Sequence, residues 1–429
     1  MIKKKDILEI KKRFKKDDCT FTKLCGCYVN SEKKIILDIE ETFLNLDEDV
    51  FFKYLEIAKK TLSGTIGNNL LELNFPDNEE YMGEKQKFFL ELKRSGLKNP
   101  KLLNTLYQSI IDNYEYEGNF LILLFHDAYD VMRKTSDNAK LDESEEVYEY
   151  IICAICPVSL SKAGLGYLQD ENKIGARIRD WVVEMPSNGF VYPAFIDRSS
   201  DIDSIIYYTK NPKDPHPELM EECLGCTSKQ TATEQKETFN SIIRSAIPDE
   251  KKSEEVIIEL QENINSLIEE HEAIYNDNDN DNDDPVVVND TIIHDILNDS
   301  GVSEEISEKI GKSYMDKFQD APPIAEHLVD SKALAANAEK KKQENLVKQV
   351  EVLKQKLEET KEELETVKSD DIEVSTDDTS EDSTEYDVVL HVKPEKVSQI
   401  TSQLIDGKKC IIIPIEENEH TKVNGINIE

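Results

Sequence analysis

The sequence lacks most of the features that would place a chain outside the ordinary globular proteins. It has a single Trp and only 15 Gly among 429 residues, which argues against fibrous and repeat designs. It contains no run of 18 apolar residues, so we expect no membrane-spanning helix and no membrane partner. The N-terminus, MIKKKDILEIKKRFKK, is basic but has no apolar stretch like that of a secretory signal. We therefore expect a cytoplasmic protein.

Basic residues are also scarce. The chain has 52 Lys and Arg against 89 Asp and Glu, a net charge of −37. Residues 1–250 account for −11 of this charge and residues 251–429 for −26. Phosphate contacts need clustered Lys and Arg, so the overall acidity argues against nucleic-acid binding. Residues 1–16 are a local basic exception, but Ile7, Ile10 and Phe14 on one face of the predicted helix more simply pack it against the domain. An acidic C-terminal part is typical of a segment that controls solubility or contacts partners.

The first 250 residues predict an α+β domain with a largely antiparallel sheet. The most apolar segment, NFLILLF at 119–125, predicts a buried central strand. Further strands are predicted at 23–30, 33–38, 69–75, 147–155, 181–184 and 190–195, and helices at 3–16, 47–62, 80–95, 99–114, 201–209, 216–224 and 231–246. Because the strands come in neighbouring pairs and do not strictly alternate with helices, the α+β class is favoured over α/β.

The remaining residues predict a succession of smaller parts. We expect an acidic helical region at 251–330 that includes a low-complexity linker, NDNDNDNDD at 276–284. A short coiled coil at 331–368 and a disordered acidic linker at 369–385 follow. Residues 386–429 predict a small β-α-β-β unit, with strands at 387–392, 409–415 and 422–428 and a helix at 394–404.

The clearest periodicity of the chain lies at 346–367. Apolar residues alternate spacings of four and three, interrupted once by a threonine, at Leu346, Val350, Leu353, Leu357, Thr360, Leu364 and Val367. Such a heptad seam, with Glu and Lys around it, predicts self-association or binding of a protein partner through 346–367.

The eight cysteines, in a long chain without a secretory signal, favour free thiols over disulfides. Two C-x-x-C pairs, Cys153 with Cys156 and Cys223 with Cys226, could together supply four thiolates to zinc. The alternative is that they are small buried residues. Residues three apart in a strand face opposite sides, and Cys153 and Cys156 lie in a predicted strand, so we favour the alternative and predict no cofactor.

A second set of candidates consists of charged and polar residues. His126, Asp127 and Asp130 follow the predicted central strand, where catalytic side chains are often found. Paired guanidinium groups could bind a phosphate or carboxylate, and the chain has such groups near an apolar strand. They occur with neighbouring acids at Arg177, Arg179, Asp180, Asp197 and Arg198. The alternative is that all of these residues form structural hydrogen bonds and salt bridges.

Several stretches resemble a bacterial family known as domain of unknown function 4317. They are KKDILEIKKRFKKDDCTFTKLCGCYVN at 4–30, KKTLSGTIGNNLLEL at 59–73, LFHDAYDVMRKTSDN at 124–138, ENKIGARIRDWVVEMPSNGFVYPAFIDRSSDI at 171–202 and IDGKKCIIIPIEENEHTKVNGINI at 405–428. The resemblance implies a soluble protein of Gram-positive bacteria. It implies no activity and no site residues, and residues 335–383 look like an insertion relative to the family.

The sequence therefore supports three hypotheses about function. The first is a non-enzymatic cytoplasmic binding or adaptor protein with an acidic, coiled-coil-bearing appendage. The second is an enzyme of unknown class that gathers His126, Asp127, Arg177, Arg179 and Asp180 in one pocket, within about 10 Å of one another. The third is a structural metal site built from the two C-x-x-C pairs.

Overall fold

A computed structural model describes most of the chain. The described residues are 1–76, 82–134, 140–275, 285–318, 321–369, 400–405, 408–414, 421–423 and 426–428. The chain divides into two units, residues 1–346 and residues 347–429. The predicted linker at 276–284, the predicted linker at 369–385 apart from its first residue, and the predicted strand at 387–392 lie outside the described residues.

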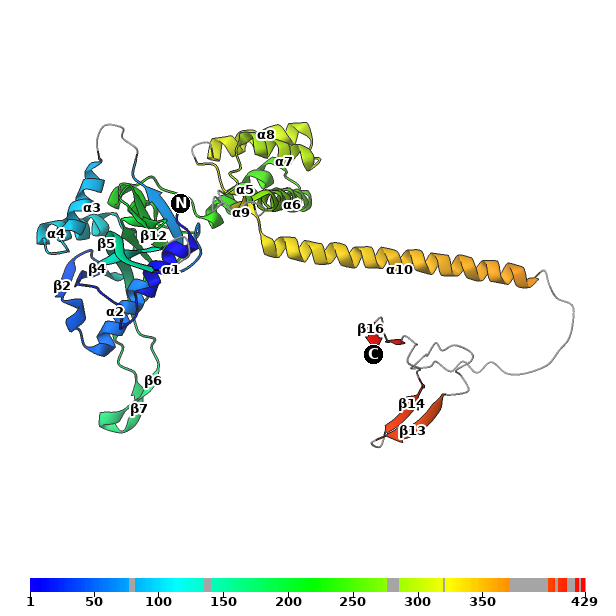
Figure 1. Ribbon diagram of the computed structural model, residues 1–429, viewed down its shortest axis with the longest axis horizontal. Helices are drawn as coiled ribbons and strands as arrows, with labels where there is room; N and C mark the ends of the chain where they lie inside the picture. The colour runs from blue at the N-terminus through cyan, green and yellow to red at the C-terminus, as the bar shows by residue number, and fades with distance from the viewer. Residues whose placement is uncertain are drawn as a thin grey trace. The chain divides into compact units, whose positions relative to one another are not determined.

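An eight-stranded sheet forms the framework of the first unit (Figure 1). In pairing order it contains β2 (Ile35–Glu41), β1 (Lys23–Val29), β4 (Asn119–Lys134), β5 (Lys140–Leu160), β9 (Asn188–Tyr192), β12 (Ser204–Thr209) and β3 (Leu70–Asn74). The eighth strand, β8 (Trp181–Val183), pairs with the far end of β5. All of these pairings are antiparallel, which confirms the predicted α+β class.

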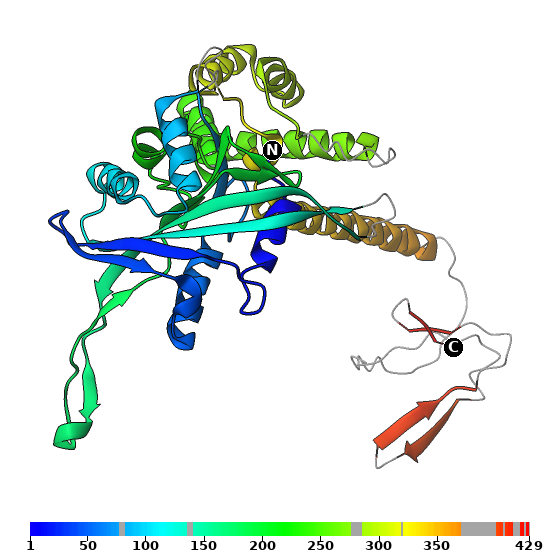
Figure 2. The same ribbon diagram turned by 60° about the vertical axis from the view of Figure 1, so that its left-hand side comes forward.

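Helices cover both faces of this sheet (Figure 2). One face packs against α1 (Lys4–Lys12) and α2 (Glu48–Lys60). The other face packs against α3 (Glu84–Arg94), α4 (Pro100–Asn113) and the short π-helix η3 (Leu219–Cys223). Consecutive residues of β4 contribute to different cores, Leu123 to the first and Leu124 to the second, because side chains alternate along a strand. A strand buried on both faces must be apolar throughout, as NFLILLF is.

Two small hairpins lie outside the eight-stranded sheet. One consists of β6 (Leu165–Leu168) and β7 (Lys173–Ala176), joined by the 3-10 turn η2 (Gln169–Glu171). The other consists of β10 (Ala194–Ile196) and β11 (Ser199–Asp201), joined by Asp197 and Arg198. Both residues of this second turn have positive φ, 48° and 64°, as a two-residue hairpin turn that matches the twist of its strands requires.

A layer of helices with its own core follows the sheet. It comprises α5 (Ala232–Ala246), α6 (Glu250–Tyr275), α7 (Asp290–Asp299), α8 (Glu304–Phe318) and α9 (Ala325–Leu328). Phe239 of α5, Leu260 of α6 and Tyr314 of α8 are buried in this core. The predicted domain boundary at residue 250 passes between α5 and α6, two helices that contribute to this same core.

The last described elements are a long helix and two hairpins. Helix α10 (Ser331–Ser369) contains 39 residues. The hairpins pair β13 (Thr401–Ile405) with β14 (Lys408–Ile412) and β15 (Thr421–Val423) with β16 (Ile426–Ile428). Residues 401–404, predicted as the end of a helix, therefore belong to a strand, and the predicted single strand at 422–428 is a hairpin.

One further prediction is wrong. Residues 201–209 were expected to be helical, but Ser204–Thr209 is strand β12, placed between β9 and β3. All six of its side chains are buried, so the helix-like spacing of its apolar residues reflects burial on both faces and not an amphipathic helix.

The close approach of β9 to β5 yields a stability prediction. A Cβ atom on Gly189 would lie 2.4 Å from the carbonyl oxygen of Cys153 and 3.0 Å from Cγ2 of Thr61. We expect Gly189→Ala to lower the free energy of unfolding by about 1–3 kcal/mol, as overpacking does, in urea denaturation. Gly164→Ala is the control, because no atom lies within 4 Å of its added Cβ. Equal stability of the two variants would contradict the assigned pairing.

Candidate functional site

His126 and Asp127 are neighbours in β4, and they point to opposite faces of the sheet. His126 lies on the side of Leu124 and the second core, whereas Asp127 lies on the side of Phe125 and the first core. The alternation of side chains along a strand makes this separation unavoidable. The two residues therefore cannot share one pocket, and each belongs to a separate polar network.

Asp127 is the centre of a buried network beneath α1. Its side chain is 1% exposed and accepts hydrogen bonds from the hydroxyls of Thr20 at 2.6 Å and Tyr150 at 2.7 Å. Nε of Arg13 lies 3.8 Å from the same carboxylate. The Arg13 guanidinium also lies over the ring of Tyr129, 4.3 Å from its centroid. A carboxylate this deeply buried and already hydrogen-bonded twice is closed to a substrate.

The turn formed by Asp197 and Arg198 also contacts α1, through salt bridges near the protein surface. Arg198 donates from one guanidinium nitrogen to both carboxylate oxygens of Glu9 in α1, at 2.6 and 2.7 Å. Asp197 lies 3.5 Å from Nζ of Lys3 and 3.7 Å from Nζ of Lys5. These two predicted site residues therefore fasten the basic N-terminal helix to the sheet.

His126 has partners at both ring nitrogens. Its Nδ1 lies 2.8 Å from the hydroxyl of Thr22, and its Nε2 lies 3.1 Å from Glu149 on the adjacent strand. Lys93 of α3 lies 3.4 Å from the other carboxylate oxygen of Glu149. Buried polar groups are normally paired in this way, so the structure supports a hydrogen-bonding role for His126. Asp130, four residues after His126, is exposed.

Arg177, Arg179 and Asp180 lie far from these networks. They occur between β7 and β8. Two pairings along β5 place them: Trp181 of β8 lies opposite Leu160, whereas His126 of β4 lies opposite Ile151. Nine residues of an extended strand span about 30 Å. The five residues proposed for one enzymatic pocket are therefore dispersed over three places and do not converge within 10 Å.

The cysteines are buried and separate. Cys153 lies in the second core and Cys156 in the first, so these two face opposite sides of the sheet, as the strand alternation predicted. Cys223 and Cys226 lie in the second core, at η3 and just after it. Among the described residues, no group of three or more His, Cys, Asp or Glu is arranged to hold a metal ion. The two C-x-x-C pairs thus do not fit a single zinc ion.

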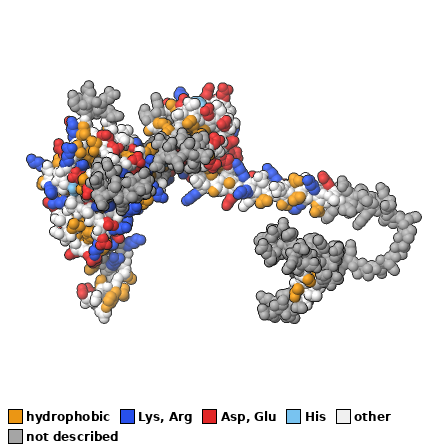
Figure 3. All heavy atoms as spheres, in the orientation of Figure 1, with side chains coloured by type: hydrophobic (Ala, Val, Ile, Leu, Met, Phe, Trp, Pro, Cys, Tyr) orange, Lys and Arg blue, Asp and Glu red, His pale blue; other side chains and the backbone are white. Residues whose placement is uncertain are grey.

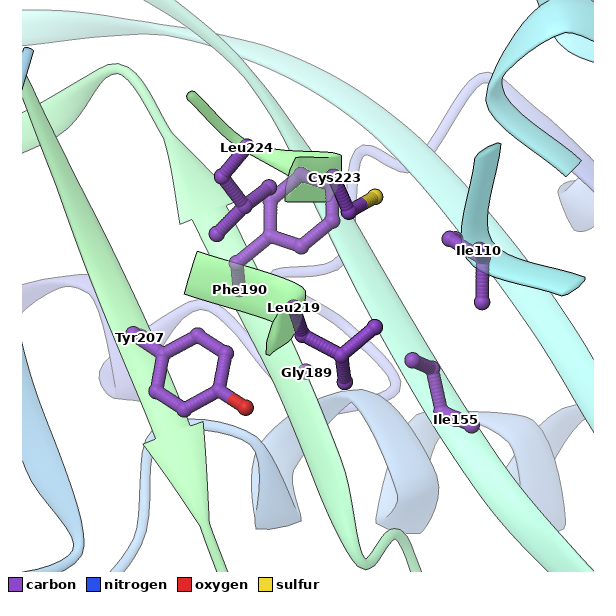
Figure 4. Close-up of a pocket in the computed structure, with 8 residues that line it drawn as sticks. All are labelled: Ile110, Ile155, Gly189, Phe190, Tyr207, Leu219, Cys223 and Leu224. Carbon is purple, nitrogen blue, oxygen red and sulfur yellow. The ribbon is translucent and has the colours of Figure 1, made fainter. Parts of the chain in front are cut away.

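A small apolar cavity lies beside Cys223 (Figure 4). Its lining consists of Ile110, Ile155, Gly189, Phe190, Tyr207, Leu219, Cys223 and Leu224. Its free volume is about 10 Å³, the room needed for a single water molecule. It is therefore a packing gap and not a ligand site.

The exposed apolar residues mark two other surfaces. Of the 26 large apolar residues that are exposed in the described part of the chain, nine lie at 160–185 and six lie in α10. We call residues 160–185 the arm. Contiguous apolar exposure of this kind marks interaction sites. The sequence analysis predicted only the strand at 181–184 in this range and missed the arm, because exposure depends on which distant segments pack against a strand.

The exposed apolar residues of the described part of the chain thus concentrate on the arm and on α10. The family described as Domain of unknown function (DUF4317) matches residues 2–426, and the chain belongs to this family. No protein with a curated description matches the chain significantly. None of the described helices is long and apolar enough to cross a membrane.

The buried network predicts a large effect of a small change at Asp127. Asp127→Asn removes the charge beside Arg13 and leaves a partly buried guanidinium without its counter-charge. We expect a loss of about 3 kcal/mol in the free energy of unfolding, measured by urea denaturation. Asp130→Asn, at an exposed position of the same strand, should change it by less than about 0.5 kcal/mol. Equal effects would show that Asp127 is not held as described.

The thiols give a second prediction. Burial raises the pKa of Cys156 and Cys226 to about 12 and that of Cys223 to about 11. It raises the pKa of Cys153 well above its usual value. A raised pKa lowers the thiolate fraction at pH 8, and the thiolate is the reactive form.

We therefore expect the thiols of the folded Cys410→Ser variant to react with Ellman's reagent at pH 8 at a rate at least a hundredfold lower than the thiols of the same variant unfolded in urea. Removing Cys410 leaves only cysteines that are buried in the structure. A thiol that reacts rapidly in the native protein, located by mass spectrometry at Cys223 or Cys226, would contradict this prediction.

Proposed function

We propose that this protein is a non-enzymatic binding or adaptor protein of the bacterial cytoplasm, and that α10 carries its contact surface. The observation that supports this proposal is the exposure of the heptad seam. In the part of α10 whose side chains are described, Leu346, Val350, Leu353 and Leu357 are 49–64% exposed. These residues repeat at the a and d positions of a coiled coil, where a second helix normally covers them.

The charges beside this seam indicate the kind of helix that would cover it. Lys354 and Lys356 occupy e and g positions next to Leu353 and Leu357, and residues at these positions meet the flanks of the opposing helix. Lysines there favour a partner helix with acidic residues at the matching positions. Self-association of α10 is the alternative occupant of the seam.

The two other hypotheses receive less support from the geometry. An enzymatic pocket needed His126, Asp127 and the Arg177 region together, and about 30 Å of β5 separates them. A structural metal site needed Cys153 and Cys156 on one side of the sheet, and they face opposite sides.

Affinity purification from the native cell tests the proposal. Full-length wild-type protein is compared with Leu353→Glu, which introduces a carboxylate into the seam. Val352→Glu is the matched control, because Val352 is also an exposed apolar residue of α10 (50%) but lies at a c position outside the seam. We expect a stoichiometric protein partner with wild type and Val352→Glu, and at least a tenfold lower recovery with Leu353→Glu. Identical recoveries from all three would overturn the proposal.

A further inference from the structure

The arm presents apolar side chains on a projecting structure (Figures 1 and 3). Its nine exposed apolar residues, which are 37–78% exposed, are Leu160, Leu165, Tyr167, Ile174, Ile178, Trp181, Val182, Val183 and Met185. They include the only Trp of the chain. Each partner of a standard protein interface contributes roughly 800 Å², and nine large side chains with this exposure can supply an area of that order.

The arm also has an open strand edge. β8 pairs with β5 on one side, and no other described strand pairs with it. The carbonyl of Asp180 accepts from Ser161 and the N–H of Glu184 donates to Pro157, so both groups face the β5 side. Hydrogen-bonding groups alternate in direction along an antiparallel strand. The backbone groups of Trp181 and Val183 therefore point to the open edge.

The charge of the arm distinguishes it from the rest of the chain. Its four basic residues, Lys162, Lys173, Arg177 and Arg179, balance its four acidic residues, Asp170, Glu171, Asp180 and Glu184. Two copies of a chain with a net charge of −37 repel each other over most of their surfaces, but two arms do not. Nε of Arg179 donates to the carbonyl of Ser161 at 2.7 Å. Among the described residues, no carboxylate lies within salt-bridge distance of Arg177 or Arg179, so the terminal guanidinium nitrogens of both residues can pair with acids of a second arm.

We propose that two copies of this chain pair through their arms, with β8 against β8 in antiparallel orientation about a two-fold axis at Val182. In this register Trp181 of each copy lies opposite Val183 of the other. The outward-pointing backbone groups of both residues then form the hydrogen bonds. An antiparallel pair of identical strands is self-complementary, as the interface of a two-fold dimer must be. The pairing also removes an exposed apolar edge, which folded proteins otherwise have to protect.

This proposal does not depend on the role of α10, and the experiment keeps the two apart. The mass of the full chain is measured by light scattering after size exclusion in the Leu353→Glu background, where the α10 seam is disrupted. We expect a dimer. Adding Trp181→Glu should raise the dissociation constant at least about thirtyfold, the effect of losing one hot-spot residue.

Leu37→Glu in the same background is the matched control. Leu37 lies in β2 at the opposite edge of the sheet and is exposed to the same degree, 57% against 56% for Trp181. The control should remain dimeric. A monomer in the Leu353→Glu background would overturn the proposal. A dimer that Trp181→Glu leaves intact, or that Leu37→Glu disrupts, would overturn it as well.

Disulfide cross-linking tests the register. With the dyad at Val182, the two Val182 residues form a non-hydrogen-bonded pair, whose Cα atoms lie about 4.5 Å apart, within the range for a disulfide. We expect Val182→Cys, in the Cys410→Ser background, to give a covalent dimer under mild oxidation, and Leu37→Cys to give none. A dimer that loses mass with Trp181→Glu but does not cross-link through Val182→Cys would overturn the β8 pairing.

Discussion

Burial of β4 and the middle of β5 on both faces is the constraint on which the rest of the structure depends. Residues 120–127 are all buried, because helices pack on each side of the sheet. Any polar side chain within these strands must find its partners in the protein, since desolvation without hydrogen bonds is unfavourable. Asp127 therefore has Thr20 and Tyr150, and His126 has Thr22 and Glu149. Residues that look catalytic in the sequence are held in the core by this requirement.

The same strand that builds the core also supports the surface that we consider functional. β5 has 21 residues, and beyond Val158 it leaves the region that the helices cover. There it pairs with β8 of the arm, where apolar side chains face solvent. The pairing of β8 with β5 thus joins one part of the arm to the central sheet.

The two exposed surfaces differ in chemistry. The arm is neutral and carries Trp and Arg, the residue types that dominate interface energetics. The seam of α10 is a ridge of Leu and Val with lysines beside it. If two copies pair through their arms, each assembly presents two α10 helices, and partners with two matching helices would bind more tightly through effective concentration alone. The arm would then serve self-association and α10 would serve partner binding, and neither surface contributes to the buried core.

What the sequence determined by itself was local or periodic. The apolar run at 119–125, the helical periods of α2, α4 and α5, and the opposite orientation of Cys153 and Cys156 all follow from patterns within a few residues. The tertiary structure alone decided which residues lie close together in space. It separated His126 from Arg179, joined Asp127 to Arg13 across more than a hundred residues, and converted 204–209 from an expected helix into a strand. It also decided exposure, because Trp181 and Phe190 are both apolar strand residues and only the packing around them makes one a surface residue and the other a core residue. Contacts between distant segments depend on the whole fold, and no local pattern encodes them.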